Sequence, residues 1–227
     1  MTMIVSQMTR RILLVTKSIN HSVVLGGAVV GALVSTKRYN MEIKTQTPFI
    51  MTKCMSYPIK NYTQIDKLKN DINYVYWLLT EDITIPGTSP YSGQIMRIKG
   101  IDLYNYIQIN GYKDKNNSLI KSNSYGGMWI NIPFTKLLTV GQIDKNIMKN
   151  SGVGGSGNSK FSRTEMLEWF PNSKKLDPNK MNTKGMIGEM LMKEYFQKQD
   201  IVIKVEKPEN IYASIDMILT VKRGEVK

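Results

Sequence analysis

The sequence contains one cysteine, Cys54, and one histidine, His21, in 227 residues. A single cysteine excludes a disulfide framework within the chain, and a single histidine excludes a zinc cage built from cysteine and histidine alone. Catalysis by a Ser-His or Cys-His pair would have to use His21, which lies at the edge of an apolar run. Carboxylates are therefore the metal ligands that the chain has in number, and they favour a hard ion such as Mg²⁺ or Mn²⁺.

Acidic residues are also scarce, since 18 Asp and Glu stand against 31 Lys and Arg and give a net charge of +13. The excess is +5 over residues 1–50, +5 over residues 51–150 and +3 over residues 151–227, so the chain has no basic tail. Such distributed charge attracts polyanions, namely nucleic acid or an anionic membrane surface. A lysine-rich surface without a partner is the alternative, and abundant Asn, Ile and Lys fit it equally well.

Long hydrophobic runs are scarce too. Val23–Val34 has twelve uncharged residues, whereas a helix that spans a bilayer needs about 20. Basic residues on both sides give it a loose likeness to a secretory signal, and Gly27 and Gly31 form a small-xxx-small pair typical of packed membrane helices. We favour a buried strand pair that turns at Gly26-Gly27, or a core helix.

The length and the 41% hydrophobic content allow one or two domains with an ordinary core. Apolar residues spaced by three and four predict an amphipathic helix over residues 62–80. Alternation predicts strands over residues 94–99, 103–109 and 125–133, with turns between residues 83 and 91. The middle of the chain is therefore expected to be mixed and rich in strands.

Six aromatic residues lie among lysines in this middle region. They are Tyr91, Tyr104, Tyr106, Tyr112, Tyr125 and Trp129. Aromatic rings beside lysines form stacking platforms for nucleotides in some proteins. More often they pack a sheet, which is the interpretation that we favour.

Residues 150–160 contain four glycines and three serines in eleven positions, which predicts a flexible connector. A phosphate-binding P-loop would need a lysine directly after Gly157, where Asn158 stands. The P-loop interpretation is therefore excluded.

Two helices are predicted beyond this connector. Residues 162–165 match a capping box, and Pro171 ends the short helix that it opens. A second helix begins at Asn182 or Thr183 and extends to about residue 197, with an apolar face broad enough to be buried against a sheet.

Two acidic residues lie in apolar surroundings. Glu189 lies beside the apolar face of the second helix, near its start, where the helix dipole stabilises a carboxylate. Strands are predicted over residues 201–205 and 211–221, with a turn at residues 207–210. Asp216 is the only charged residue from 211 to 220, and an isolated carboxylate there is costly unless something pairs with it. A metal ion is one such partner.

Four short motifs follow one another between residues 182 and 227, about a fifth of the chain. They are Lys184-Gly185-x-x-Gly188-Glu189, Tyr195-Phe196, Ile201-Val202-Ile203 and Ile215-Asp216-Met217-Ile218. Together they resemble the start of the PD-(D/E)XK nuclease core, and are most similar to its archaeal Holliday-junction-resolvase-like and restriction-endonuclease-like branches.

In that family a helix Glu, a strand Asp and the Glu of a Glu-x-Lys motif hold one or two Mg²⁺ ions, and the Lys orients or activates the attacking water. By position, the resemblance implies that Glu189, Asp216 and Glu225 are catalytic ligands of Mg²⁺ or Mn²⁺ and that Lys227 is the catalytic lysine. The implied reaction is metal-assisted hydrolysis of a phosphodiester.

The last two of these residues conflict with hairpin geometry. A two-residue turn at Arg223-Gly224 would leave Glu225 about six residues, or roughly 20 Å, from the level of Asp216. Either a further Glu-x-Lys lies beyond Lys227 in a longer chain, or a nuclease-like scaffold has lost its active centre and is used for binding.

The expected fold class is α+β or α/β, with a strand-rich region followed by a restriction-endonuclease-like α/β core that this sequence contains in part. The expected divisions are an apolar N-terminal segment (1–40), a mixed α/β region with the DNA-recognition surface (41–149), the Gly/Ser connector (150–160) and the nuclease-like core (161–227).

The expected function is that of a magnesium-dependent endonuclease that acts on duplex DNA, in the cytoplasm or with nucleic acid, in a chain that can form a homodimer. The alternative is a non-catalytic nucleic-acid-binding or assembly protein, such as a virion or ribonucleoprotein component. A membrane-associated protein anchored by Val23–Val34 is a third hypothesis.

Overall fold

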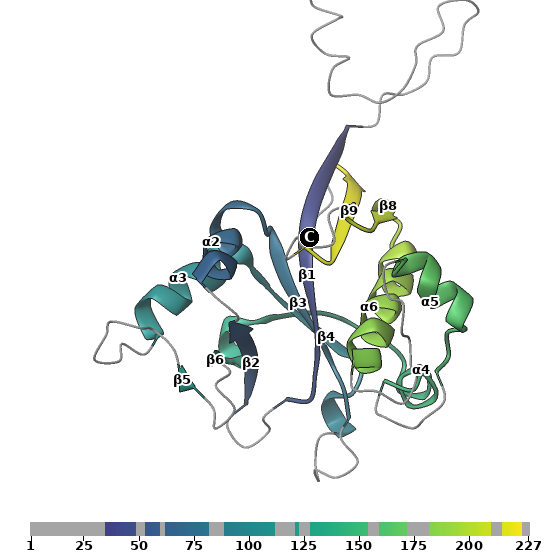
Figure 1. The fold of residues 1–227 in the computed structure, drawn as a ribbon, viewed down its shortest axis with the longest axis horizontal. Coiled ribbons are helices and arrows are strands. Elements are labelled where there is room, and N and C mark those ends of the chain that lie inside the picture. The colour runs from purple at the N-terminus through teal and green to yellow at the C-terminus, as the bar shows by residue number, and fades with distance from the viewer. Residues whose placement is uncertain are drawn as a thin grey trace, which may run out of the picture. The chain divides into compact units, whose positions relative to one another are not determined.

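Six strands form one mixed sheet in the computed structural model, in the order β7-β4-β3-β1-β9-β8 (Figure 1). Their bounds are β1 Thr36–Gln46, β3 Tyr74–Leu79, β4 Gln94–Lys99, β7 Leu138–Gln142, β8 Val202–Glu206 and β9 Met217–Lys222. The structure describes residues 35–48, 53–59, 62–81, 89–111, 121–122, 128–153, 159–171, 182–209 and 215–223. β1 and β3 are parallel and the other neighbours are antiparallel, so the fold is of the α+β class.

The strand β1 has a central position, between β3 and β9. It pairs with β9 from Thr36 opposite Lys222 to Met41 opposite Met217. Beyond the last pair, the N–H of Arg223 donates to the carbonyl oxygen of Ser35 at 2.7 Å. The first and last strands that the structure describes are therefore neighbours in the sheet.

Three helices cover one face of the sheet, to the right in Figure 1: α4 Lys145–Asn150, α5 Arg163–Trp169 and α6 Asn182–Gln197. Their apolar side chains pack against the sheet in one core. Its buried members from the sheet are Met41, Ile43, Tyr76, Leu78, Ile95, Met217, Leu219 and Val221. The helix α6 lies so close to β1 that a Cβ atom on Gly188 would overlap the side chain of Thr45.

The opposite face is covered by α2 Tyr62–Asn70, α3 Gly100–Asn110 and a three-stranded antiparallel sheet, to the left in Figure 1. The small sheet has the order β2-β6-β5, with bounds Cys54–Ile59, Met128–Pro133 and Lys121–Ser122. Two short 3₁₀ turns, η1 Ser89–Tyr91 and η2 Phe134–Lys136, complete the described elements. Val75, Trp77 and Leu79 of β3 point into this second core.

Several predicted elements are confirmed. Ser162 is the N-cap of α5, its hydroxyl accepts from the N–H of Glu165 at 3.2 Å, and the Glu165 carboxylate accepts from the N–H of Ser162 at 2.7 Å. The bounds of α6 match the predicted second helix. The strands predicted at residues 94–99 and 201–205 are β4 and β8.

Two predicted elements are wrong. The helix predicted over residues 62–80 ends at Asn70, and Tyr74–Leu79 is the strand β3. Both faces of β3 are buried, so its run of apolar residues carries no alternation that would mark it as a strand. The strand predicted over residues 103–109 is part of α3, whose buried side chains, Leu103 and Ile107, are four residues apart.

The expected divisions of the chain meet in one sheet. Residues 36–46 supply β1, the middle region supplies β3, β4 and β7, and residues beyond the predicted connector supply β8 and β9. Within that connector Ser151 and Val153 are buried, and residues 154–158 lie outside the described residues.

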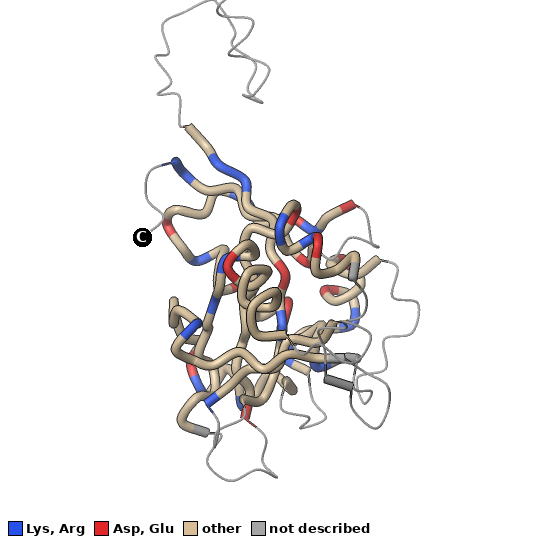
Figure 2. Tube along the Cα trace, turned by 90° about the vertical axis from the view of Figure 1, so that its left-hand side faces the viewer, with Lys and Arg blue, Asp and Glu red and all other residues tan. Residues whose placement is uncertain are grey.

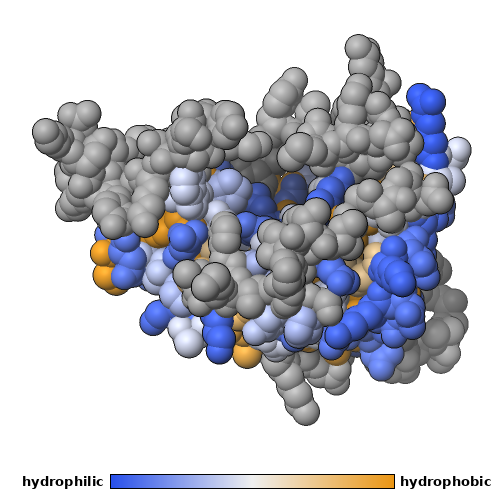
Figure 3. All heavy atoms as spheres, turned by 90° about the horizontal axis from the view of Figure 1, so that it is seen from below, coloured by the Kyte–Doolittle hydropathy of each residue, from blue (hydrophilic) through white to orange (hydrophobic). Residues whose placement is uncertain are grey.

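The apolar segment Val23–Val34 also lies outside the described residues. No helix in the part of the chain that is described has the length and apolar character needed to cross a membrane. Seen from below, the described surface is mostly hydrophilic with small hydrophobic areas (Figure 3). The large apolar side chains exposed in the described part of the chain are Ile101 and Ile109 on α3, Leu138 on β7 and Ile203 on β8.

Candidate active site

Asp216 immediately precedes β9, at the point where β9 meets β1. Because Met41 pairs with Met217, extending the register by one residue places Asp216 opposite Glu42. The N–H of Asp216 donates to the carbonyl oxygen of Met41 at 2.8 Å, and its carboxylate Oδ2 accepts from the N–H of Ile43 at 2.7 Å. The side chain of Asp216 is thereby held against the middle of β1.

The residues on either side of Ile43 are Glu42 and Lys44, so Asp216 lies beside a Glu-x-Lys motif. The sequence contains two such motifs, Glu42–Lys44 and Glu225–Lys227. Glu225 and Lys227 lie outside the described residues. The Glu-x-Lys at residues 42–44 is visible in the sequence. It was missed because the motif was expected downstream of Asp216.

Glu42 is a buried carboxylate with several partners, and only 2% of its surface is exposed. The hydroxyl of Tyr57 donates to its Oε2 at 2.6 Å, the side-chain amide of Gln64 donates to its Oε1 at 3.3 Å, and Lys44 forms an ion pair with it. A buried carboxylate needs such partners. Burial, reinforced by the negative charge of Glu42, raises the pKa of Tyr57, which keeps its hydroxyl protonated as a donor.

Glu189 lies on the side of α6 that faces Trp169, and it is 8% exposed. The indole N–H of Trp169 donates to its Oε1 at 2.8 Å, and Lys207 forms an ion pair with it. Burial raises the pKa of Glu189 to about 7, because desolvation outweighs the opposing effect of Lys207, and the charge of Asp216 adds to the increase. Glu189 and Asp216 are therefore close enough to influence each other.

Asp216 itself has a raised pKa. Burial is the main cause, and the positive charge of Lys44 and the hydrogen bond from Ile43 oppose it. The charge of Glu42 raises it further, and Lys207 lowers it. Asp216 is thus influenced by Glu42, Lys44 and Lys207, and its own charge acts on Glu189.

The chemistry of these donors fits a hard divalent cation, because all three are carboxylates. However, among the described residues no three His, Cys, Asp or Glu side chains are gathered closely enough to hold one ion together. Glu42 and Glu189 are each paired with a lysine instead, Lys44 and Lys207. An ion bound between the carboxylates would have to displace the ammonium group of Lys207 from Glu189.

Further lysines surround the Glu189 side of this group. Lys193 Nζ lies 4.4 Å from the ring centroid of Trp169, and Lys207 Nζ lies 4.6 Å from that of Phe170. Figure 2 shows blue lysine and arginine segments distributed over the described trace, with fewer red acidic ones.

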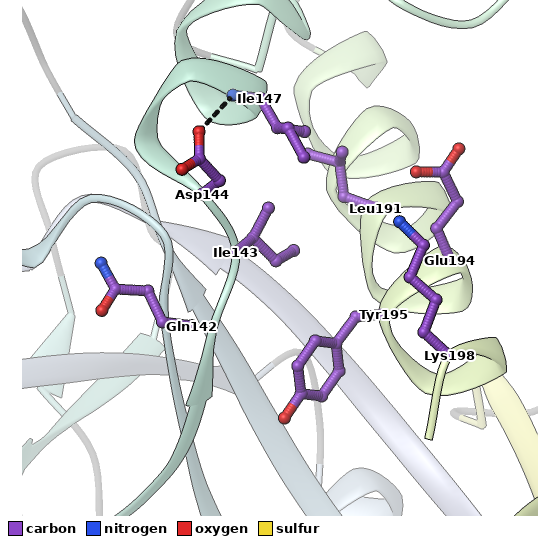
Figure 4. A pocket seen from close by; sticks show the side chains of 8 residues that line it. All are labelled: Gln142, Ile143, Asp144, Ile147, Leu191, Glu194, Tyr195 and Lys198. Carbon is purple, nitrogen blue, oxygen red and sulfur yellow. Dashed lines mark hydrogen bonds between the residues drawn. The ribbon is translucent and has the colours of Figure 1, made fainter. Parts of the chain in front are cut away.

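A small hollow between β7, α4 and α6 lies apart from these carboxylates (Figure 4). Ile143, Ile147 and Leu191 contribute apolar surface to it. The carboxylate of Asp144, which also lines it, caps α4 by accepting from the N–H groups of Asn146 and Ile147 at 2.7 and 3.4 Å. Asp144 therefore has a structural role there.

Comparisons with models of known protein families, with curated proteins and with solved structures found no match for this chain. Function is therefore inferred from the geometry of the site, since a fold class alone does not establish function.

Proposed function

We propose that the protein is a metal-dependent endonuclease that hydrolyses phosphodiester bonds in DNA, with an active centre of Glu42, Lys44, Glu189 and Asp216. The observation that carries the proposal is the hydrogen bond from the N–H of Ile43 to the carboxylate of Asp216, which sets a lone acidic residue beside a Glu-x-Lys motif. A PD-(D/E)XK nuclease needs a helix Glu, a strand Asp and a Glu-x-Lys on the neighbouring strand. In this proposal they would come from α6, from the residue directly before β9 and from β1.

The order of these parts along the chain is a circular permutation of the expected one. The resemblance leads one to expect the Glu helix, the Asp strand and the Glu-x-Lys strand in that sequence, whereas here the Glu-x-Lys strand comes first. Pairing of β1 with β9 brings the motif to Asp216 without a hairpin between the two strands. The proposal therefore does not depend on Glu225 and Lys227.

Each residue has a distinct role in this proposal. Glu42 and Asp216 would hold Mg²⁺, whose positive charge would offset the negative charge that develops on the phosphodiester. Glu189 would join them only by leaving Lys207 and moving closer, since no three such side chains are gathered among the described residues. Lys44 is partly exposed beside Glu42, where its ammonium group can orient a water molecule or contact the phosphate. Tyr57 and Gln64 hold Glu42 in place.

The test is cleavage of plasmid DNA with Mg²⁺ or Mn²⁺ by the full chain and two sets of variants. We expect Asp216→Asn and Glu42→Gln to lower cleavage at least about 100-fold, because each removes a charge that acts in the transition state. The matched control is Glu225→Gln with Lys227→Met, which alters the other Glu-x-Lys and should leave cleavage unchanged. Loss in the control with retention in Glu42→Gln would contradict the assignment.

The alternative is a non-catalytic nucleic-acid-binding protein. It is favoured by the ion pairs of Glu42 and Glu189 with lysines, which neutralise both carboxylates without a metal ion. Under this alternative the wild-type chain binds DNA without Mg²⁺ and cleaves none. Absence of cleavage in every form, with binding retained, would favour it.

A further inference from the structure

A row of aromatic and cationic side chains crosses the sheet on the face that α6 covers in part. We call it the tyrosine row: Lys37 and Tyr39 of β1, Tyr74 of β3, Arg97 of β4 and Tyr195 of α6. None of these tyrosines belongs to the six aromatic residues singled out in the sequence. The ring centroids of Tyr39 and Tyr74 are 5.5 Å apart, and the hydroxyl of Tyr195 donates to the carbonyl oxygen of Val140 in β7 at 3.2 Å.

The strand register shows on which face of the sheet the tyrosine row lies. Tyr74 lies beside Met41 in the parallel pair of β1 and β3, and Arg97 lies opposite Tyr76 in the antiparallel pair of β3 and β4. Alternation along β1 puts Tyr39 on the same face as Met41 and on the face opposite Glu42. The row therefore lies on the other face of the sheet from Glu42.

The row is accessible and positively charged. Tyr39, Tyr74, Arg97 and Tyr195 are half-buried, and Lys37 is exposed. Arg97 Cζ lies 4.8 Å from the ring centroid of Tyr74, and Lys37 Nζ lies 4.9 Å from that of Tyr39. Within the described ranges, no acidic side chain forms an ion pair with Lys37 or Arg97.

We propose that the tyrosine row binds single-stranded nucleic acid, with unpaired bases stacked on Tyr39 and Tyr74 and phosphates bound by Lys37 and Arg97. Accessible aromatic rings on a sheet with adjacent cations are the elements that such binding requires, and the half-buried rings of Tyr39 and Tyr74 are in part accessible. The side chain of Lys37 is exposed, so it can move off the ring of Tyr39. A base can then stack on that ring while Lys37 binds the phosphate of the same nucleotide. Because the row lies on the other face from Glu42, this proposal does not rest on the nuclease proposal.

The experiment is fluorescence anisotropy of a labelled oligonucleotide of about 15 thymidines, a length within the usual range for such sites. The full chain is used in EDTA, so that cleavage does not enter. We expect Tyr39→Leu and Tyr74→Leu each to weaken binding about tenfold, the loss of one base–aromatic stack. Tyr106→Leu is the matched control, because Tyr106 is a half-buried tyrosine on α3 whose hydroxyl donates to Asn131, and its change should leave affinity unaltered.

A second measurement uses only the wild-type chain. An abasic oligonucleotide of equal length keeps every phosphate and lacks the bases. We therefore expect its affinity to be at least about tenfold lower than that of the thymidine strand. Equal affinity for the abasic and thymidine strands would overturn the proposal, as would unchanged affinity in both tyrosine variants. A uridine strand and a duplex of the same length show whether RNA or DNA is preferred and whether the bases must be unpaired.

Discussion

Glu189 carries a pH dependence that follows from its burial. Its pKa is raised from 4.5 to about 7, so between these values the native state holds a proton that the unfolded chain has released. Stability from this group is therefore lost as the pH rises through that window, by about 3 kcal/mol in total.

Urea unfolding of the metal-free chain and of Glu189→Gln tests this shift. Between about pH 5 and pH 8 we expect the wild type to lose about 2 to 3 kcal/mol relative to the variant, which has no carboxyl group to ionise at this position. Saturating Mg²⁺ at the upper pH should restore stability to the wild type more than to the variant, because a ligand of the native state stabilises it. Parallel pH profiles for the two proteins would refute the raised pKa.

At the residue level, much of the candidate site was predictable. Glu189 and Asp216 stood out because each is an acidic residue in an apolar context, and burial of both is what the sequence indicates. Glu42 did not stand out, because its neighbours along β1 alternate between polar and apolar in an ordinary way. Glu42 is of interest because the neighbouring Ile43 donates a hydrogen bond to Asp216, which is 173 positions away in the sequence. No local sequence pattern indicates a contact over that separation.

The approach of α6 to β1 depends on the absence of a side chain at Gly188. A Cβ atom at Gly188 would meet the side-chain atoms of Thr45. Thr45 is β-branched, so its χ1 rotamers are restricted and it cannot easily move away. Gly185, one turn earlier in the same helix, has open space where a Cβ would lie. The two glycines therefore form a matched pair.

We expect Gly188→Ala to lower the free energy of unfolding by about 1 to 3 kcal/mol through overpacking against β1. Gly185→Ala should be neutral or stabilising by up to about 1 kcal/mol, because alanine is the better helix former. Urea denaturation measures both, and Thr45→Ala in the Gly188→Ala background should recover part of the loss. Equal stability of the two single variants would show that α6 does not pack on β1 as described.

Elements with strong local signals were predicted well, and those whose type is decided by distant contacts were not. The capping box of α5 and the long apolar face of α6 are local signals, and both helices are confirmed. Tyr74–Leu79 became a strand because β1 and β4 lie on either side of it, although its spacing also fits a helix.

For the molecule as a whole, the net charge of +13 predicts steep salt dependence of DNA binding. If about six phosphates are neutralised, affinity should fall about 1,000-fold between about 50 and 200 mM salt. Lys193→Gln, beside Trp169, should lower the slope by about one if that lysine contacts a phosphate. Anisotropy titrations at several salt concentrations measure both, and a slope near zero would remove nucleic acid as the partner.

The neighbouring positions of β1 and β9 also determine when the sheet around the candidate site can form during synthesis. Ile43 leaves the ribosome 173 residues before Asp216, which at about 5 to 20 residues per second is roughly 10 to 35 s. Once β3 is made, β1 can pair with it, while β9 is still missing from the other edge of β1 and Glu42 has no Asp216 beside it. The nascent chain therefore lacks one strand pairing of β1, an edge that chaperones can bind, and the described carboxylates come together only when β9 is made.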